Sequence, residues 1–422
     1  MSIRFTSALT PAHSRRAFLA TAGVAAAATG LAACGGGSGF NDSGSDAGAG
    51  SGNGLTLLIG SSGEAETEAV TAAAKRFTEK EGVEVQVIPA SDLNQQLSQG
   101  FASGSPADVF YLSTDALAGY AANGSLEPYG DKLSVKDELY PALVEAFTVD
   151  GTFYAAPKDF STLTLVINKK LWEAAGLTEA DYPADWAGLK AVAQKLTDGS
   201  RVGLGTSNEY QRLGAFMAQA GGELVTDGTA SANSDANVEA LTFVKELLAD
   251  GSMTFASDLG AGWGGEAFGK ELCAMTIEGN WITGALEKDY PELEAVFVEL
   301  PAGPKGRGTL QFSNAWGMAA DSTHKDDALK LIEFLTTKEQ QLEFASAFGV
   351  MPSLESAEDE WKTEFPEMAA FIDSAAYAKN PPAQAGMAEV ITELNSQLET
   401  LASADPKALL DGVQQNLEAT LG

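Results

Sequence analysis

LTLLIGSSGEAETEAVTAAAKRFTEKEGVEVQVIPA, residues 55–90, contains the pattern that decides the fold class. It begins with the short apolar run Leu55–Ile59, which is typical of a buried strand, and a Gly/Ser loop follows. Residues 64–80 place apolar side chains at four-residue spacing, which predicts a helix. Residues 83–88 alternate apolar and polar side chains and predict a second strand.

The same alternation continues along the chain. The other predicted elements are strands at 107–112, 162–167, 272–277 and 315–319, helices at 93–101, 169–175, 187–196, 238–248 and 328–335, and a mostly helical region at 358–421. Strands that alternate with helices indicate an α/β fold with a mainly parallel sheet. About 370 residues remain after the N-terminal segment, a length that suits two domains.

The N-terminal segment has the order of a bacterial export signal. Arg15 and Arg16 precede an apolar run at residues 17–28, and small residues then lead to Cys34. This order resembles a lipoprotein signal of twin-arginine type, in which the residue after the cleavage site is a lipidated cysteine. An ordinary secretory peptide with a chance cysteine is the alternative, and the export route, twin-arginine or general secretory, is left open.

Two predictions follow for this segment. Residues 1–33 are expected to be removed as a signal peptide, and residues 34–54 to form a flexible Gly/Ser tether that starts at the lipidated Cys34. The protein would then be exported and anchored to the outer face of the cell membrane. Stable attachment requires more than one acyl chain, for example palmitate.

The charge of the chain excludes one class of partner. The sequence has 26 Lys+Arg and 58 Asp+Glu, for a net charge of -32. Residues 1–33 hold three arginines and no acid, so the predicted mature chain carries a net charge of -35. Such an acidic surface repels phosphate backbones and argues against nucleic-acid binding. No later stretch has the roughly 20 apolar residues that a membrane span needs.

The sequence offers little for metal or cofactor chemistry. His13 lies in the predicted signal, which leaves His324 alone, so a histidine-based zinc site and a serine triad are both disfavoured. Glycine-rich near-motifs at 260–265 and 264–270 lack the preceding strand and the Ser or Thr that nucleotide binding needs. No cofactor and no metal are therefore expected. Cys273 is interpreted as a buried apolar residue.

Three tryptophans stand beside glycine and amide residues: Trp263, Trp281 and Trp316. Such rings suit a binding face, because the C–H patches of sugars stack on aromatic rings and their hydroxyls bond to carboxylates and amides. Burial of the same tryptophans at a domain junction is the alternative. By the same context Glu278 and Asn280, which precede Trp281, are predicted to contact a ligand.

Several segments, in this order, resemble the sugar-binding extracellular solute-binding proteins of ABC transporters, of the maltose-binding type. The segments are Ser105–Leu112, Tyr154–Pro157, Leu165–Lys169, Tyr182–Trp186, Gly269–Trp281, Asn314–Ala320 and Gly349–Ser353. The resemblance implies a type II periplasmic-binding-protein fold. In that fold each of two lobes is a mainly parallel sheet flanked by helices, and the ligand lies in the cleft between them.

The resemblance also implies boundaries and site residues. Lobe 1 is expected at 55–158 and 310–352, lobe 2 at 159–309 and 353–422, with crossovers near 158–161, 305–312 and 350–354. The ligand-binding residues carried over by position are Ser61, Ser62, Glu64, Thr114, Asp115, Asp159, Glu209, Tyr210 and Trp281. Leu112 and Ala116 depart from the maltose-binding pattern, which puts maltose itself in doubt. Trp361 is the C-terminal candidate for a stacking ring, but no alignment supports it.

The predicted function is that of the binding component of an ABC importer, a monomer that delivers a sugar or oligosaccharide to the permease subunits. A binding protein for another solute, such as a polyamine or a peptide, is the first alternative. A secreted glycosidase is the second, because an acidic chain always offers carboxylate pairs.

Overall fold

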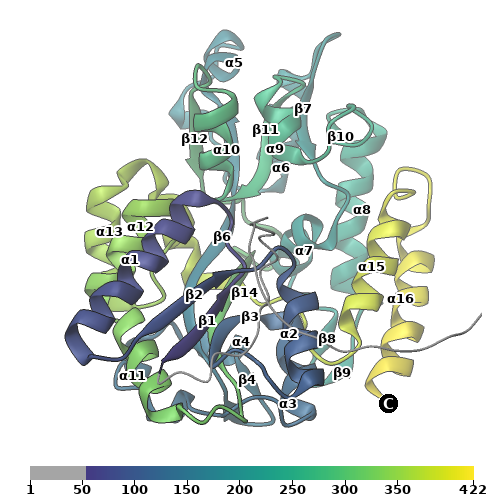
Figure 1. Cartoon of the computed structure of the whole chain (residues 1–422). Helices are drawn as coiled ribbons and strands as arrows, with labels where there is room; N and C mark the ends of the chain where they lie inside the picture. The colour runs from purple at the N-terminus through teal and green to yellow at the C-terminus, as the bar shows by residue number, and fades with distance from the viewer. Residues whose placement is uncertain (1–53) are drawn as a thin grey trace, which may run out of the picture. The chain divides into compact units, whose positions relative to one another are not determined.

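The computed structural model describes residues 54–422. The predicted signal peptide, Cys34 and almost the whole tether lie outside the described residues. The predicted α/β fold is confirmed, and Figure 1 shows the strands and helices in chain order.

The strands are β1 Leu55–Ile59, β2 Val85–Pro89, β3 Val109–Ser113, β4 Thr148–Val149, β5 Thr152–Phe153, β6 Ala156–Asn168, β7 Val202–Thr206, β8 Val225–Thr226, β9 Thr229–Ala230, β10 Met253–Phe255, β11 Cys273–Gly279, β12 Ala295–Val298, β13 Thr309–Met318 and β14 Ala378–Lys379. The helices are α1 Glu64–Glu81, α2 Leu93–Ser103, α3 Thr114–Ala122, α4 Pro141–Ala146, α5 Lys169–Ala174, α6 Trp186–Leu196, α7 Tyr210–Gln219, α8 Asp235–Ala249, α9 Gly264–Gly269, α10 Ile282–Asp289, α11 Lys325–Leu335, α12 Lys338–Phe348, α13 Glu358–Glu364, α14 Ala369–Asp373, α15 Met387–Leu398 and α16 Pro406–Leu421.

Two strands are much longer than the sequence predicted. β6 begins at Ala156 instead of residue 162, and β13 begins at Thr309 instead of residue 315. The first half of β6 contains Lys158 and Asp159, two charged residues that precede the apolar run predicted as the strand. Every residue of β6 is nevertheless buried, because these charged side chains pair with each other and with neighbouring groups.

The main sheet has the order β10-β7-β11-β6-β13-β3-β1-β2. On one flank β1 runs parallel to β2 and β3, and on the other β7 runs parallel to β10 and β11. In the middle, β6 and β13 run antiparallel to each other and to β11 and β3 respectively. The sheet is therefore parallel on each flank and antiparallel along the two strands that join the flanks.

The apolar residues of 54–422 form two large cores and two smaller clusters. The first core surrounds β1, β3 and α1, with Leu57 and Phe110 at its centre, and the second surrounds β11, α7 and α8, with Met275 and Leu213 at its centre. One of the smaller clusters includes Trp361, which is fully buried. Its indole N–H donates to the Val350 carbonyl at 3.0 Å, so Trp361 offers no ring to a ligand.

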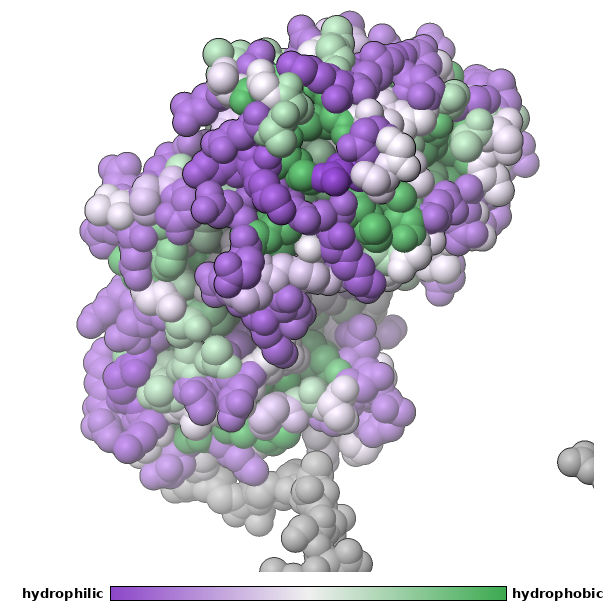
Figure 2. Space-filling model, turned by 90° about the horizontal axis from the view of Figure 1, so that it is seen from above, coloured by the Kyte–Doolittle hydropathy of each residue, from purple (hydrophilic) through white to green (hydrophobic). Residues whose placement is uncertain are grey.

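Helices cover both flanks of this sheet. α12 packs along α1, and α15 and α16 lie side by side at one edge, where Figure 1 draws them in yellow. Figure 2 shows a largely hydrophilic face on which apolar patches are separated by polar residues. No helix within residues 54–422 is long and apolar enough to cross a membrane.

The approach of α6 to β7 depends on a glycine. A Cβ on Gly203 would lie 2.0 Å from the carbonyl oxygen of Ala193, whereas a Cβ on Gly199 would meet nothing within 4 Å. We expect Gly203→Ala to lower the free energy of unfolding by about 2 kcal/mol or more, because the backbone of α6 must move. Gly199→Ala, four residues away, should change it by less than about 0.5 kcal/mol.

Urea denaturation followed by circular dichroism measures both variants. Equal stability of the two variants would contradict the close approach of α6 to β7.

Candidate functional site

The candidate site lies where β6 and β13 pass between the two cores. Ser161 of β6 pairs with Phe312 of β13, and the Ser161 hydroxyl accepts a hydrogen bond from the Asn280 backbone N–H at 3.1 Å. The next residue, Trp281, packs against Phe312 with ring centroids 5.7 Å apart and an interplanar angle of 71°. Trp281 is 39% exposed, more than any other large apolar side chain of residues 54–422.

A buried charged group, the Glu66 cluster, lies on one side of this crossing and consists of Ser62, Glu66, Tyr111, Lys158 and Asp159. Oε2 of Glu66 accepts hydrogen bonds from the backbone N–H and the hydroxyl of Ser62, at 2.7 and 2.8 Å. Oε1 accepts from the Tyr111 hydroxyl at 2.8 Å and from Lys158 Nζ at 3.2 Å. Lys158 also pairs with Asp159. One ammonium thus lies between two carboxyl groups.

These contacts set the protonation of the cluster. Burial acts to raise the pKa of Glu66, but the Lys158 charge and the hydrogen bonds from Ser62 and Tyr111 outweigh it and lower the pKa. Burial raises the pKa of Asp159, although Lys158 opposes the effect. Burial acts to lower the pKa of Lys158, and the carboxylate of Asp159, with Tyr111 and Glu66, raises it on balance. Lys158 therefore stays charged at neutral pH.

A second charged group, the Glu278 cluster, lies on the other side of the crossing and consists of Glu209, Arg212, Glu278 and Trp281. Oε2 of Glu278 accepts hydrogen bonds from Trp281 Nε1 at 2.9 Å and from Arg212 Nε at 3.1 Å, and it pairs with Arg212 Nη2 at 2.8 Å. Glu209 lies 3.8 Å from Arg212 Nη1. Burial raises the pKa of Glu278, and Arg212 opposes this shift.

A cavity of about 440 Å³ reaches Leu310, near the start of β13. It is lined by residues of α3, α7, β13 and β14, among them Thr114, Tyr210, Leu310 and Lys379. Leu310 and Phe312 lie two positions apart on β13, so their side chains share one face of the strand. The Trp281 ring and this cavity therefore adjoin the same strand face.

The structure brings some of the predicted site residues together and leaves others apart. Ser62 and Asp159 meet in the Glu66 cluster, Glu209, Glu278 and Trp281 meet in the Glu278 cluster, and Thr114 and Tyr210 line the cavity. Ser61 bonds within its own loop to the Gly63 carbonyl, and Glu64 and Asp115 are exposed at helix starts. Trp263 is partly buried and packs over Gly265 of α9.

Three predicted ligand contacts need correction. Glu278 is fully buried, so it reaches a ligand only through the groups it holds. Asn280 is only 5% exposed, and its side-chain amide donates to the Gly349 carbonyl at 2.9 Å. It therefore links the end of β11 to the end of α12. Trp316 is 1% exposed and its ring packs edge-on to Tyr111 in the first core, so it presents no face for stacking.

The sequence analysis also missed site residues. It chose the exposed Glu64, whereas the buried carboxylate of the same helical turn is Glu66. Lys158, beside Asp159 in a strand with apolar neighbours, was a signal that could have been used, because buried charges occur in pairs. Arg212 had no signal of its own, since a basic residue in an amphipathic helix is normally solvated.

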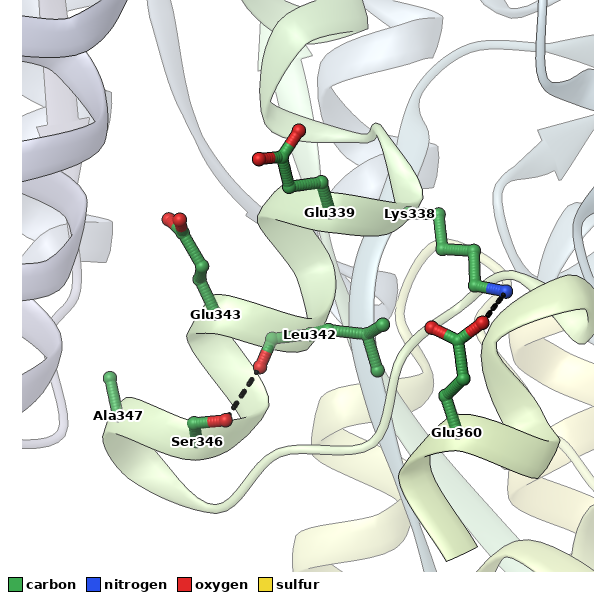
Figure 3. A pocket seen from close by; sticks show the side chains of 7 residues that line it. All are labelled: Lys338, Glu339, Leu342, Glu343, Ser346, Ala347 and Glu360. Atoms are coloured by element: carbon green, nitrogen blue, oxygen red, sulfur yellow. Dashed lines mark hydrogen bonds and ion pairs between the residues drawn. The ribbon is translucent and has the colours of Figure 1, made fainter. Parts of the chain in front are cut away.

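Residues 54–422 hold no group of three or more His, Cys, Asp or Glu side chains placed to bind a metal ion. Cys273 is buried as predicted, and burial raises the pKa of its thiol to about 12. An open groove of about 770 Å³ lies on α12 and α13, where Lys338 pairs with Glu360 (Figure 3). None of the predicted site residues lines this groove.

The Glu66 cluster makes a prediction that separates the two neighbouring glutamates. We expect Glu66→Gln to lower the free energy of unfolding at pH 7 by about 2 kcal/mol, because Lys158 and Tyr111 lose a charged acceptor. Glu64→Gln removes the same charge from the same helical turn but at an exposed position, and should cost less than about 0.5 kcal/mol. Chemical denaturation measures both.

The difference should depend on pH in one direction. The folded pKa of Glu66 lies below its ordinary value of 4.5, so its contribution to stability is present above pH 4.5 and is lost as the pH falls through the folded pKa. Wild type and Glu66→Gln should therefore converge in stability at acidic pH. A gap that stays constant down to pH 3 would contradict this role.

Comparisons with known proteins agree with this architecture. The model of the family described as bacterial extracellular solute-binding protein matches residues 72–381. The diacetylchitobiose binding protein DasA of Streptomyces coelicolor is 28% identical over 364 residues, which cover 82% of this chain and 84% of DasA.

Solved structures share the fold. The cyclic alpha-maltosyl-1,6-maltose binding protein from Arthrobacter globiformis superimposes with a TM-score of 0.78 at 22% identity, covering 87% of this chain and 98% of that chain. The sugar-binding protein MalE from Xanthomonas citri gives a TM-score of 0.77 at 21% identity, covering 87% and 97%. From the family match across most of its length, the chain belongs to the bacterial extracellular solute-binding proteins.

Proposed function

We propose that this protein is the extracellular binding component of an ABC importer, and that it binds a sugar or oligosaccharide and delivers it to the permease subunits. The observation that carries the proposal is the exposed ring of Trp281, which the buried Glu278 holds by a hydrogen bond beside the crossing of β6 and β13. An aromatic face stacks on the C–H surface of a sugar, while nearby carboxylates accept bonds from its hydroxyls. DasA and the Arthrobacter protein are both named for saccharide ligands.

The ligand is proposed to lie between lobe 1, residues 55–158 and 310–352, and lobe 2, residues 159–309 and 353–422. The two cores support two lobes joined by β6 and β13, but they place Leu310 with lobe 2 and Leu354 and Ala357 with lobe 1. Closure of the lobes around a ligand would be a hinge motion at the crossovers. The protein is proposed to act as a monomer and to bind without turnover.

A cationic solute is the second candidate. Each cluster holds one cation between two carboxyl groups: Lys158 with Glu66 and Asp159, and Arg212 with Glu278 and Glu209. This excess of acid would suit a polyamine. An exposed indole stacks on a neutral sugar and also attracts an ammonium by a cation–π contact, so the screen below has to decide between the two ligands.

The test is a thermal-shift screen of the purified mature domain against mono- and oligosaccharides and against polyamines and peptides. A ligand that binds only the folded state raises the Tm, and the shift keeps growing with ligand concentration beyond saturation. Calorimetry with a sugar that raises the Tm should show that Trp281→Ala binds it about 1–3 kcal/mol more weakly than the wild type does, the usual loss for an aromatic anchor.

Trp281→Ala should keep its fold. The affinity of Trp281→Phe, which keeps a smaller ring, should lie between those of the wild type and Trp281→Ala. A shift with polyamines and none with sugars would replace the sugar by the cationic solute. Release of cleaved products from a saccharide would favour the glycosidase reading.

The membrane anchor is proposed from the sequence alone. A lipidated Cys34 with a tether of about 20 Gly/Ser-rich residues would give the lobes a reach on the order of 25 Å from the membrane. That reach allows the protein to meet a permease in the same membrane.

We expect Cys34→Ala to release the protein into the medium or to leave it unprocessed, with sugar binding by the purified domain unchanged. Mass spectrometry of the membrane fraction should find Cys34 as the N-terminal residue with its acyl mass. A mature N-terminus elsewhere, without acyl mass, would overturn the lipid anchor but not the receptor.

A further inference from the structure

We propose that Glu278 is a positioning residue that fixes the indole plane of Trp281 and cancels the charge of Arg212 behind it, so that one face of the ring is held ready for a neutral sugar. This proposal rests on the proposed function and names a residue that acts without touching the ligand. It gives a role to a carboxylate that is fully buried beside an exposed tryptophan.

Three donors converge on a single oxygen of Glu278. Trp281 Nε1 lies at 2.9 Å, Arg212 Nη2 at 2.8 Å and Arg212 Nε at 3.1 Å from Oε2. A tryptophan side chain has two rotatable bonds, and a hydrogen bond to its only donor restrains both. The carboxylate thus sets the rotation of the ring as well as its position.

Three other neighbours contact the ring, and Trp281 nevertheless stays exposed. The Arg212 guanidinium carbon lies 5.1 Å from the ring centroid, and Phe312 packs edge-on at 5.7 Å. Gly279 lies so close that a Cβ there would be 2.3 Å from the indole Cζ3. The ring is therefore backed by Gly279 and Arg212 while it keeps 39% of its surface exposed.

Glu278 is itself held in place from behind. Its Oε1 and the hydroxyl of Thr276 would each lie 2.7 Å from a Cβ on Gly264, so the start of α9 packs directly on them. Oε1 and the Thr276 hydroxyl have no hydrogen-bond partner among residues 54–422. The close approach of α9 therefore limits the room that the carboxylate has to rotate away from Trp281.

The charge balance explains why a carboxylate is used at this position. The Arg212 side chain is 12% exposed and lies under the ring. Without Glu278 only the more distant and more exposed Glu209, 3.8 Å from Arg212, would offset this charge, and the site would attract anions more strongly. With Glu278 in place the Arg212 guanidinium is paired, and Arg212 still helps to hold the Trp281 ring in one orientation. Preorganisation of this kind raises affinity because the ring loses little freedom on binding.

The first test needs no ligand. The indole N–H signal of Trp281 in a ¹H–¹⁵N spectrum, assigned by its disappearance in Trp281→Phe, should lie downfield and exchange slowly with solvent in the wild type. In Glu278→Gln it should move upfield and exchange faster, because the charged acceptor is lost. An indole signal with the shift and exchange of a free N–H in the wild type, or no change in Glu278→Gln, would overturn the proposal.

A second variant separates ring placement from charge. Gly279→Ala pushes the indole away while it leaves Glu278 and Arg212 in place, and Gly284→Ala, with nothing within 4 Å of its Cβ, is the matched control. With a sugar from the screen, Gly279→Ala should bind at least about tenfold more weakly than Gly284→Ala, at similar Tm. Equal affinities would overturn the role of ring placement.

The charge role has its own readout. With a neutral sugar and the uronate analogue of the same sugar as probes, wild type should prefer the neutral probe, and Glu278→Gln should lose that preference by a factor of about ten. Gly279→Ala should weaken binding of the neutral probe and keep the preference for it over the uronate. If no sugar binds the wild type, the proposed function fails, and the indole spectrum still decides whether Glu278 positions Trp281.

Discussion

β6 and β13 run side by side through the middle of the sheet, and the pairing of these two strands is the constraint on which the other parts depend. In β6, Ala156 belongs to the first core, and Leu163 and Leu165 belong to the second. In β13, Leu310 belongs to the second core and Trp316 to the first. The flanking parallel strands attach to this pair on both sides. The candidate site lies where the pair changes from one core to the other, at Ser161 and Phe312.

A long antiparallel pair can enter the site only if its charged residues are satisfied. Lys158 and Asp159 lie in the first half of β6, a strand that is buried throughout, and each charge would be costly alone in an apolar environment. Glu66, held by Ser62 and Tyr111, completes the group. On the other side of the crossing, Glu278 pairs with the charge of Arg212. In both places a buried ion pair stabilises little by itself but fixes side chains in one arrangement.

The sequence predicted the fold class because its signal is repeated: apolar runs for strands and four-residue spacing for helices occur along the whole chain. It underestimated β6 because Lys158 and Asp159 look like the end of a strand when their partner, Glu66, is distant in sequence. It underestimated β13 because Gln311, Ser313 and Asn314 break its apolar pattern. It identified Trp281 from its glycine and amide neighbours. The same context suggested Trp316, which tertiary packing buries, so local composition could not separate a binding ring from a core ring.

The pairing of β3 with β13 has a consequence for the order in which the chain can fold. Ser113 pairs with Asn314, and the first core includes Leu331 and Leu335 of α11. A chain still under synthesis therefore holds β1, β2 and β3 with an open sheet edge until the ribosome has added residues far downstream. Contacts so distant in sequence form slowly, and an uncovered edge is prone to aggregate. A nascent chain of this design would gain from a chaperone that covers β3 until β13 arrives.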